Sequence, residues 1–146
     1  MQPSHNRPMR VMVIEDNPAD VALLRMALDK AGFPYDMTVI TDGADALVAL
    51  GQMDSDGCAV PDITVLDLNL PKYDGLEVLE AARANPRLAM MPIAILTSSS
   101  SPRERSRIQM FRLVTYIKKP PELDEYLRIG PMIRDFVCEN RQGSAF

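Results

Sequence analysis

The chain has 146 residues, 47% of them hydrophobic, and a formal net charge of −4, which fits one globular domain with a single buried core. The excess of acidic residues argues against direct binding to nucleic acid, whose phosphates attract basic surfaces. No apolar run approaches the roughly 18 residues that span a membrane, and the N-terminus lacks the apolar core of a signal peptide, so we expect a cytoplasmic protein.

The sequence alternates between short apolar runs, typical of buried strands, and segments with helical spacing of apolar residues. Strands are predicted over residues 11–14, 38–40, 63–66, 93–96 and 114–117. Helices are predicted over residues 17–32, 44–52, 75–84, 103–111 and 122–139. Five strands alternating with five helices predict an α/β fold, a doubly wound parallel sheet in the flavodoxin-like order 2-1-3-4-5 with helices on both faces.

Capping residues support several of these boundaries. Asn17 suits an N-cap with Pro18 at the first helical position, and Asp20 stands three residues past the cap in a box-like arrangement. Gly32 is the expected stop of that helix. Gly130-Pro131 interrupts the last helix, so a kink or local break is expected there. We expect one domain over residues 10–140, with a flexible leader over 1–9 and a flexible tail over 141–146.

Cysteine and histidine usage excludes some chemistry. Cys58 and Cys138 are far apart and form no CxxC motif, so neither a zinc site nor a disulfide framework is indicated, and we expect both to be reduced and largely buried. His5 is the single histidine and lies in the leader, which excludes a Ser-His-Asp relay.

Polar residues follow the apolar strands where each strand ends. Glu15-Asp16 follows the first strand, Asp67 the third, Thr97 the fourth, and Lys118-Lys119-Pro120 the fifth. In the order 2-1-3-4-5 the switch point lies between the first and third strands, which places Glu15-Asp16 beside Asp67. Two carboxylates 4 Å apart repel by about 4 kcal/mol at an effective dielectric of 20. A cluster of this kind therefore predicts a bound divalent cation, although Glu15-Asp16 alone would fit a solvated turn and helix start.

The same residues suit phosphoryl chemistry. Asp16, Asp67 and the backbone carbonyl of Asn69 could hold Mg²⁺ and leave sites for water and a phosphate oxygen. A carboxylate held in this way can act as a nucleophile toward phosphorus. Lys119 and Thr97, from the flanking strand ends, could neutralise or hydrogen-bond the phosphoryl oxygens.

The pattern resembles the receiver domain of two-component response regulators. The motifs that carry the resemblance are Glu15-Asp16-Asn17, the segment 66–71 followed by Asp74-Gly75, Thr97 after an apolar strand, and the segment 116–120. The resemblance covers about residues 10–138, nearly the whole chain. The opening 15–20 and the segment 67–71 look most like the single-domain subgroup associated with bacterial phytochrome kinases.

The resemblance implies a role for each matching residue. Asp67 would be the phosphoacceptor, and Lys119 would contact the phosphoryl group. Asp16, Asp67 and the Asn69 carbonyl would bind Mg²⁺, with Glu15 acting through water. Thr97 and Tyr116 would form a switch, Tyr116 turning inward behind Thr97, although Tyr116 also fits an ordinary half-buried strand aromatic.

The resemblance also implies partners and output. The donor would be a sensor histidine kinase, with a bacteriophytochrome as a candidate. We expect no further domain after residue 146, and therefore output by protein contact, phosphorelay or a homodimer formed through helix four, strand five and helix five. Arg112-Leu113-Val114, Pro121 and Gly130-Pro131 depart from the family pattern on that same face, and their effect on it stays open.

Two other functions remain open. Asp67 could be the nucleophile of a phosphohydrolase, but such enzymes usually place a second carboxylate two residues later, where this chain has Asn69. The chain could also be a receiver-like scaffold that never accepts phosphate, against which the intact set Asp16, Asp67, Thr97 and Lys119 argues. A receiver would itself not be an enzyme beyond catalysing its own phosphotransfer and slow dephosphorylation.

Overall fold

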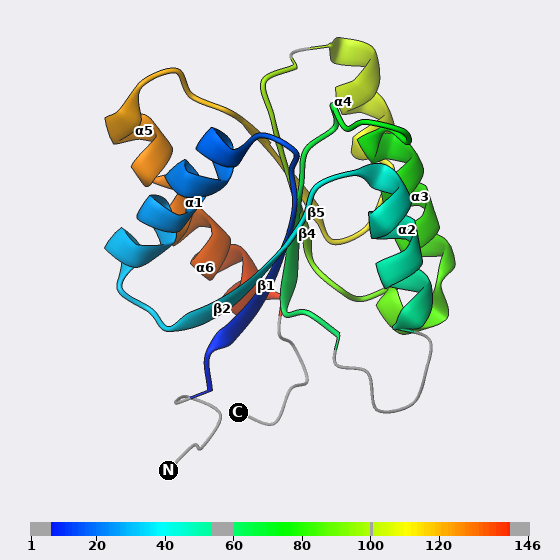
Figure 1. Ribbon diagram of the computed structural model, residues 1–146, viewed down its shortest axis with the longest axis horizontal. Helices are drawn as coiled ribbons and strands as arrows, with labels where there is room; N and C mark the ends of the chain where they lie inside the picture. The colour runs from blue at the N-terminus through cyan, green and yellow to red at the C-terminus, as the bar shows by residue number, and fades with distance from the viewer. Residues whose placement is uncertain (1–6, 54–59, 100, 141–146) are drawn as a thin grey trace.

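The computed structural model describes residues 7–53, 60–99 and 101–140, and they form a parallel five-stranded sheet in the order β2-β1-β3-β4-β5 (Figure 1). The strands are β1 Met9–Ile14, β2 Tyr35–Ile40, β3 Ile63–Leu66, β4 Ile93–Thr97 and β5 Val114–Lys118. The helices are α1 Pro18–Ala31, α2 Gly43–Gln52, α3 Gly75–Ala84, α4 Pro102–Ile108, α5 Leu123–Leu127 and α6 Ile129–Glu139, with a short 3₁₀ helix, η2, at Pro86–Leu88. The predicted flavodoxin-like fold is confirmed.

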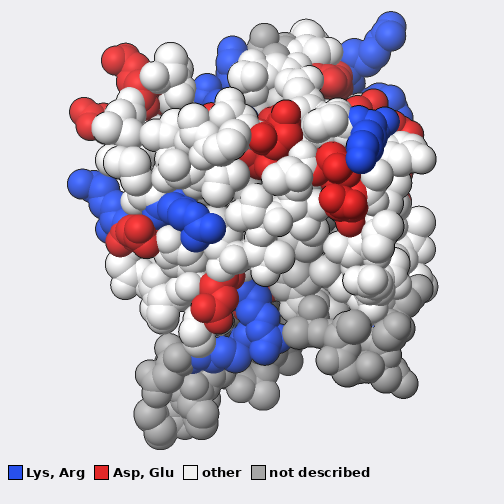
Figure 2. Space-filling view, in the orientation of Figure 1, with Lys and Arg blue, Asp and Glu red and all other residues white. Residues whose placement is uncertain are grey.

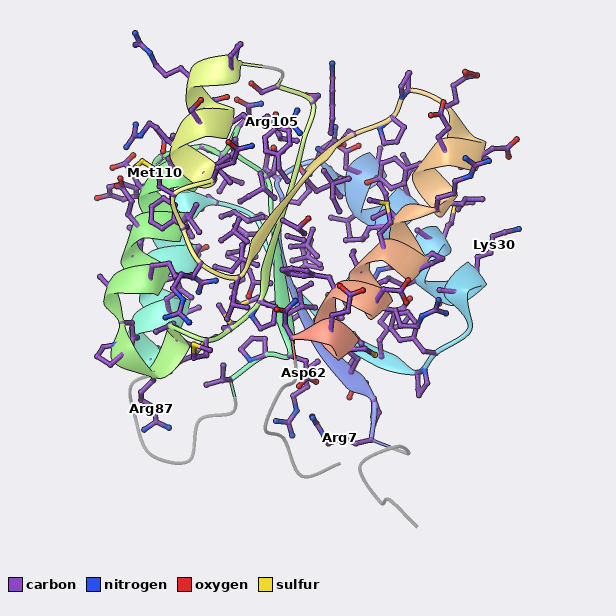
Figure 3. All side chains as sticks on the ribbon, turned by 180° about the vertical axis from the view of Figure 1, so that it is seen from behind. Arg7, Lys30, Asp62, Arg87, Arg105 and Met110 are labelled. Carbon is purple, nitrogen blue, oxygen red and sulfur yellow. The ribbon has the colours of Figure 1, made fainter. Side chains whose placement is uncertain are left out.

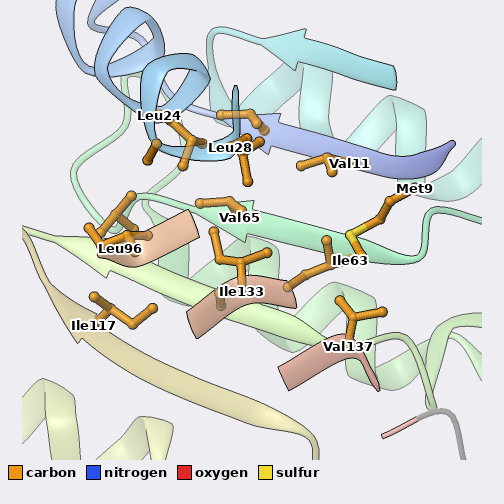
Figure 4. Packing of buried hydrophobic residues seen from close by; sticks show 14 of the residues in the cluster. Met9, Val11, Leu24, Leu28, Ile63, Val65, Leu96, Ile117, Ile133 and Val137 are labelled. Carbon is orange, nitrogen blue, oxygen red and sulfur yellow. The ribbon is translucent and has the colours of Figure 1, made fainter. Parts of the chain in front are cut away.

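Helices cover both faces of the sheet. Figure 1 shows α1, α5 and α6 on one face and α2, α3 and α4 on the other. Each face has its own core, because successive side chains of a strand point to opposite sides. On the α1 side, Leu24, Leu28 and Ile133 pack over the strand side chains Val65 and Leu96 (Figure 4). Burying each such side chain stabilises the fold by roughly 2 kcal/mol. This packed core keeps the sheet edge that carries the polar residues rigid.

Local capping chemistry begins and ends the helices as predicted in most places. The Asn17 side chain accepts a hydrogen bond from the Ala19 N–H at 2.9 Å and caps α1. Gly32 ends α1 with φ 83°, a backbone conformation that costs glycine little. The box-like role expected for Asp20 is wrong. The Asn17 N–H instead donates to Glu15 Oε2 at 3.1 Å, and the Asp20 carboxylate accepts a hydrogen bond from Lys119.

Several boundaries differ from the sequence prediction. Strand β2 begins at Tyr35 rather than residue 38, because its register with β1 runs from Met9↔Tyr35 onward. Helix α4 ends at Ile108 rather than residue 111. Cys138 is exposed and not buried as expected, because it lies on the outer face of α6. Cys58, His5, most of the predicted leader and the predicted tail lie outside the described residues.

The predicted last helix is two helices. Arg128 separates α5 from α6, two residues before the Gly-Pro pair that suggested an interruption. Pro131 has no N–H to donate to the Leu127 carbonyl, so a continuous helix would lack a hydrogen bond there. Gly130 lies against the Ala27 carbonyl, where a β-carbon would collide with the backbone of α1. The break and the glycine together let α6 pack closely on α1.

One arginine joins three segments at the opposite edge of the sheet. The Arg83 guanidinium of α3 donates hydrogen bonds of 2.8 to 3.1 Å to four backbone carbonyls, those of Leu88, Met91, Arg112 and Leu113. Burial, together with the charge of Arg112, lowers its pKa to about 10. Leu113 has φ 56°, in the left-handed region that a non-glycine residue rarely adopts. Arg83 thus binds the turn that precedes β5.

Candidate functional site

The strand register brings the predicted polar residues to one edge of the sheet. Ile14 pairs with Leu66 at the ends of β1 and β3, and the Asp67 N–H donates to the Ile14 carbonyl at 3.0 Å. Glu15 and Asp67 therefore leave adjacent strands side by side. On the other flank, the Lys119 N–H donates to the Thr97 carbonyl at 2.8 Å. The prediction that these strand ends lie at one edge of the sheet is confirmed.

Strand alternation divides the site between the two faces of the sheet. Glu15, Asp67 and Lys119 each stand two residues after a side chain of the core that α1 covers, namely Val13, Val65 and Ile117. Thr97 instead stands two residues after Ile95, in the core that α2 and α3 cover. Because the period of a strand is two, the three charged side chains turn toward α1 and the hydroxyl turns toward the other face.

Three of the site's carboxylates lie together as a possible cation site. Glu15, Asp16 and Asp67 each offer an oxygen, and these oxygens lie within 4.8 Å of one another. Glu15 and Asp67 are buried, and Asp16 is exposed. An all-oxygen set with one open side suits a hard divalent cation such as Mg²⁺ or Mn²⁺. Asn69 donates its backbone N–H to Asp67 Oδ1 at 3.2 Å, and its carbonyl as a metal ligand stays a prediction.

The Lys119 ammonium lies among carboxylates at 10% side-chain exposure. Its Nζ is 2.7 Å from Glu15 Oε1, 2.8 Å from Asp20 Oδ2 and 3.3 Å from Asp67 Oδ2. Burial alone would lower the pKa of Lys119, but the hydrogen bonds to Asp20 and Glu15 and the charge of Asp67 outweigh burial and raise it. Lys119 is therefore a fixed positive charge beside Asp67. Lys118, its neighbour at the end of β5, is exposed.

Glu15 is the carboxylate whose ionisation the site opposes. Burial raises the pKa of Glu15 from 4.5 to about 7, and the charge of Asp67 acts in the same direction. The hydrogen bonds from Lys119 and from the Asn17 N–H act against the rise without cancelling it. In the metal-free protein, Glu15 therefore takes up a proton near neutral pH.

Asp20 was not predicted from the sequence as part of the site. It occupies the third position of α1, and its carboxylate reaches the lysine on β5 across 99 residues of chain. Its place in the first turn of the helix that follows Glu15-Asp16 was the available signal. That signal also fitted a capping role, and nothing local distinguished the two.

Thr97 and Tyr116 connect the site with α4. Thr97 is fully buried, and its Oγ1 accepts a hydrogen bond from the Ser99 N–H at 3.1 Å. The Tyr116 hydroxyl donates to the Ser99 carbonyl at 2.6 Å, so Ser99 contacts both residues. The Arg105 guanidinium of α4, labelled in Figure 3, lies 5.1 Å from the centre of the Tyr116 ring. A change at Thr97 can therefore reach α4 through one loop residue.

The motif Asp74-Gly75 shapes the loop that follows Asp67. Asp74 and Glu77 form a reciprocal capping box that begins α3. A β-carbon on Gly75 would lie 2.5 Å from both the Asp67 carbonyl oxygen and the Leu68 Cα. Glycine at this position lets α3 begin directly against the loop that carries the central aspartate.

None of the helices within residues 7–53, 60–99 and 101–140 has both the length and the hydrophobicity of a membrane-spanning segment. The face seen in Figure 2 mixes acidic and basic side chains, and its described residues form no continuous basic stripe.

Known proteins resemble this chain over most of its length. The probable methanogenesis regulatory protein FilR2 of Methanothrix harundinacea is 31% identical over 129 residues, covering 88% of this chain and 83% of that protein. The response regulator Rcp1 of Synechocystis sp. is 29% identical over 140 residues, covering 95% of each. The structure of its Mn²⁺-bound form matches with a TM-score of 0.77 at 28% identity, over 88% of this chain and 94% of that chain.

The structure of the phosphorylated cyanobacterial phytochrome response regulator RcpA matches with a TM-score of 0.79 at 29% identity, over 90% of this chain and 95% of that chain. The subgroup resemblance drawn from the motifs is thus confirmed. Residues 11–129 match the response regulator receiver domain family, and they include every residue of the site. With the sheet order, the acidic strand ends and the lysine after β5 in place, this chain belongs to the response regulator receiver domain family.

Proposed function

We propose that this protein is a response regulator that accepts a phosphoryl group on Asp67 from the phosphohistidine of a sensor histidine kinase. The observation that carries the proposal is the Lys119 ammonium, 3.3 Å from Asp67 Oδ2, beside a cluster of three carboxylates that suits a divalent cation. A nucleophilic carboxylate, a fixed positive charge and a cation site are the parts that phosphoryl transfer requires.

In the transfer, an oxygen of Asp67 forms a bond to phosphorus while the bond from phosphorus to the imidazole nitrogen breaks, and the electron pair stays on that nitrogen. Asp16 and Asp67, with the Asn69 carbonyl, would hold Mg²⁺, and Glu15 would act through water. The bound ion would offset the charge that builds up on the phosphoryl oxygens. Lys119 would donate to one of those oxygens from the opposite flank.

Signalling follows from what the new charge attracts. A phosphoryl group adds roughly −1.5 to −2 charge units if it resembles other protein phosphates. The Thr97 hydroxyl, which now accepts a hydrogen bond from the Ser99 N–H, would have to rotate away from its present face of the sheet to donate to that group. Movement of Thr97 would disturb Ser99, to which Tyr116 is also bonded. Moving an equilibrium from 1:99 to 99:1 needs about 5.5 kcal/mol of differential stabilisation. The surface that would change is α4, β5 and α5.

The partners proposed are those of a cytoplasmic signalling protein. RcpA is by name a phytochrome response regulator, and Rcp1 is by name a response regulator. A bacteriophytochrome is therefore the candidate kinase. A homodimer through α4, β5 and α5, or a phosphorelay, would provide output without direct contact to nucleic acid or membrane.

Incubation with Mg²⁺ and acetyl phosphate tests the proposal. Wild type should gain one acid-stable, base-labile phosphoryl group, resolved by intact-protein mass spectrometry, and Asp67→Ala should gain none. Co-incubation with candidate ATP-loaded kinases should then give rapid transfer to Asp67. An unlabelled wild type would support the scaffold reading. Turnover of a sugar phosphate that Asp67→Ala abolishes would support the phosphohydrolase.

A further inference from the structure

The first turn of α1 contributes a carboxylate to the site. We propose that Asp20 holds the Lys119 ammonium in place beside Asp67 throughout phosphoryl transfer, an inference that rests on the proposed function. The contact is short, 2.8 Å between Asp20 Oδ2 and Lys119 Nζ, and the Asp20 side chain is 23% exposed. It joins the first turn of α1 to the loop after β5.

The ammonium has three hydrogens and three carboxylate partners. A lysine ammonium donates at most three hydrogen bonds, and Glu15, Asp20 and Asp67 accept one each. A phosphoryl oxygen can therefore gain a hydrogen bond from Lys119 only if one carboxylate gives up its own. Which carboxylate stays determines where the ammonium lies during the reaction.

Asp20 is the partner with no competing task. Glu15 and Asp67 belong to the group of oxygens that could hold a cation, and Asp20 does not. Asp67 also carries the phosphoryl group once it has reacted. A cation and a phosphoryl group therefore compete with Lys119 for Glu15 and Asp67, while the contact to Asp20 can persist.

The position of Asp20 is itself held by the fold. Its side chain is relieved of capping, because Asn17 caps α1 and Glu15 accepts the Asn17 N–H. Its backbone carbonyl accepts a hydrogen bond from the buried Tyr126 hydroxyl at 3.4 Å. Leu24, one turn further along α1, is buried in the core. Because these contacts hold the Asp20 backbone in place, its carboxylate can fix the position of the flexible Lys119 side chain within the narrow tolerance that phosphoryl transfer needs.

The test compares phosphorylation rates at saturating Mg²⁺ with acetyl phosphate as the donor. Asp20→Asn should react about tenfold or more slowly than wild type, as is typical when the partner that orients an active-site group is lost. Asp20→Glu, which keeps the charge, should recover much of the rate. The control Glu122→Gln removes a charge from an exposed residue between Lys119 and α5 that makes no side-chain capping bond, and it should react like wild type.

A double-mutant cycle separates positioning from general loss of structure. In a Lys119→Met background, Asp20→Asn should slow the remaining reaction no further, because Asp20 acts only through Lys119. If Asp20 merely stabilised the fold, its effect would persist in that background. The inference is overturned if Asp20→Asn reacts as fast as wild type, or if the two effects simply add. If wild type itself takes no phosphate, the proposed function is wrong. If wild type is phosphorylated but the two substitutions act independently, only the role of Asp20 is wrong.

Discussion

Replacing Asp16 by Asn should stabilise the metal-free protein while weakening its response to Mg²⁺. Asn has almost the shape of Asp and no charge. Asp16 is exposed, and within the described ranges its side chain makes no hydrogen bond or ion pair. Its carboxylate oxygen nevertheless lies within 4.8 Å of those of Glu15 and Asp67. The substitution therefore removes repulsion and leaves attractive contacts intact.

The size of the effect follows from the separation of the charges. Two unit charges no more than 4.8 Å apart repel by at least about 3 kcal/mol at an effective dielectric of 20 and at least about 1 kcal/mol in water. Because Asp16 is exposed, the water value is the better guide for each of its two pairs, at a pH above 7 where Glu15 is ionised. Lys119 offsets part of the charge on Glu15 and Asp67. We expect a net gain of about 1 to 2 kcal/mol, or roughly 3 to 6 °C in Tm.

The assay is thermal and urea unfolding of wild type and Asp16→Asn, first with a chelator and then across a Mg²⁺ titration. With chelator the variant should unfold at the higher temperature, and the difference should shrink as NaCl screens the charges. As Mg²⁺ rises, wild type should gain stability by mass action and overtake the variant. Glu122→Gln serves as the control for removal of an exposed acidic charge and should change neither curve appreciably.

A variant that is equally or less stable than wild type in chelator would refute the reasoning, because the cluster would then carry no net repulsion. Equal stabilisation of both proteins by Mg²⁺ would show that Asp16 is not part of the cation site.

Three further predictions concern Glu15, the Arg83 hydrogen bonds and the contact between α1 and α6. Because burial raises the pKa of Glu15 from 4.5 to about 7, the folded metal-free protein binds this proton more tightly than the unfolded chain. The stability that this tighter proton binding contributes is complete below pH 4.5 and is lost as the pH rises through 7. Over this range the free energy of unfolding of wild type should fall by roughly 3 kcal/mol relative to that of Glu15→Gln. Parallel curves of unfolding free energy against pH for the two proteins would contradict this prediction. Arg83→Met should lower the free energy of unfolding by about 3 kcal/mol or more in urea, since four carbonyls lose a charged donor, and a change below about 1 kcal/mol would mean that water replaces the guanidinium. Gly130→Ala should cost about 2 kcal/mol by forcing α6 away from the Ala27 carbonyl, and an unchanged Tm would show that the helices separate freely.

Much of the architecture was readable from short stretches of sequence. Strand β3 and helix α3 have the predicted bounds, because apolar runs, N-caps and helix-ending residues act over a few positions of chain. The order of polar residues after apolar strands also placed Glu15, Asp16 and Asp67 at one edge, as the register confirms.

Boundaries that depend on a neighbour were less well predicted. Strand β2 is three residues longer than its apolar pattern, since it lies at the sheet edge and gains its extra pairs from β1. The last helix breaks at Arg128 rather than at the Gly-Pro pair. The sequence signalled an interruption, and it falls three residues before Pro131, which has no N–H to donate to the Leu127 carbonyl.

The sequence by itself determined which chemical groups stand at the strand ends, because alternation and capping are local and repeat along the chain. Only the tertiary structure decided which of those groups meet. Asp20 could cap its own helix or bind a lysine 99 residues away, and the fold, which brings the first turn of α1 to the loop after β5, selected the lysine. Arg83 likewise donates hydrogen bonds to backbone carbonyls up to 30 residues away in the sequence. A charged side chain on a short stretch of chain has many possible partners, and the folded backbone alone brings one of them within hydrogen-bond distance.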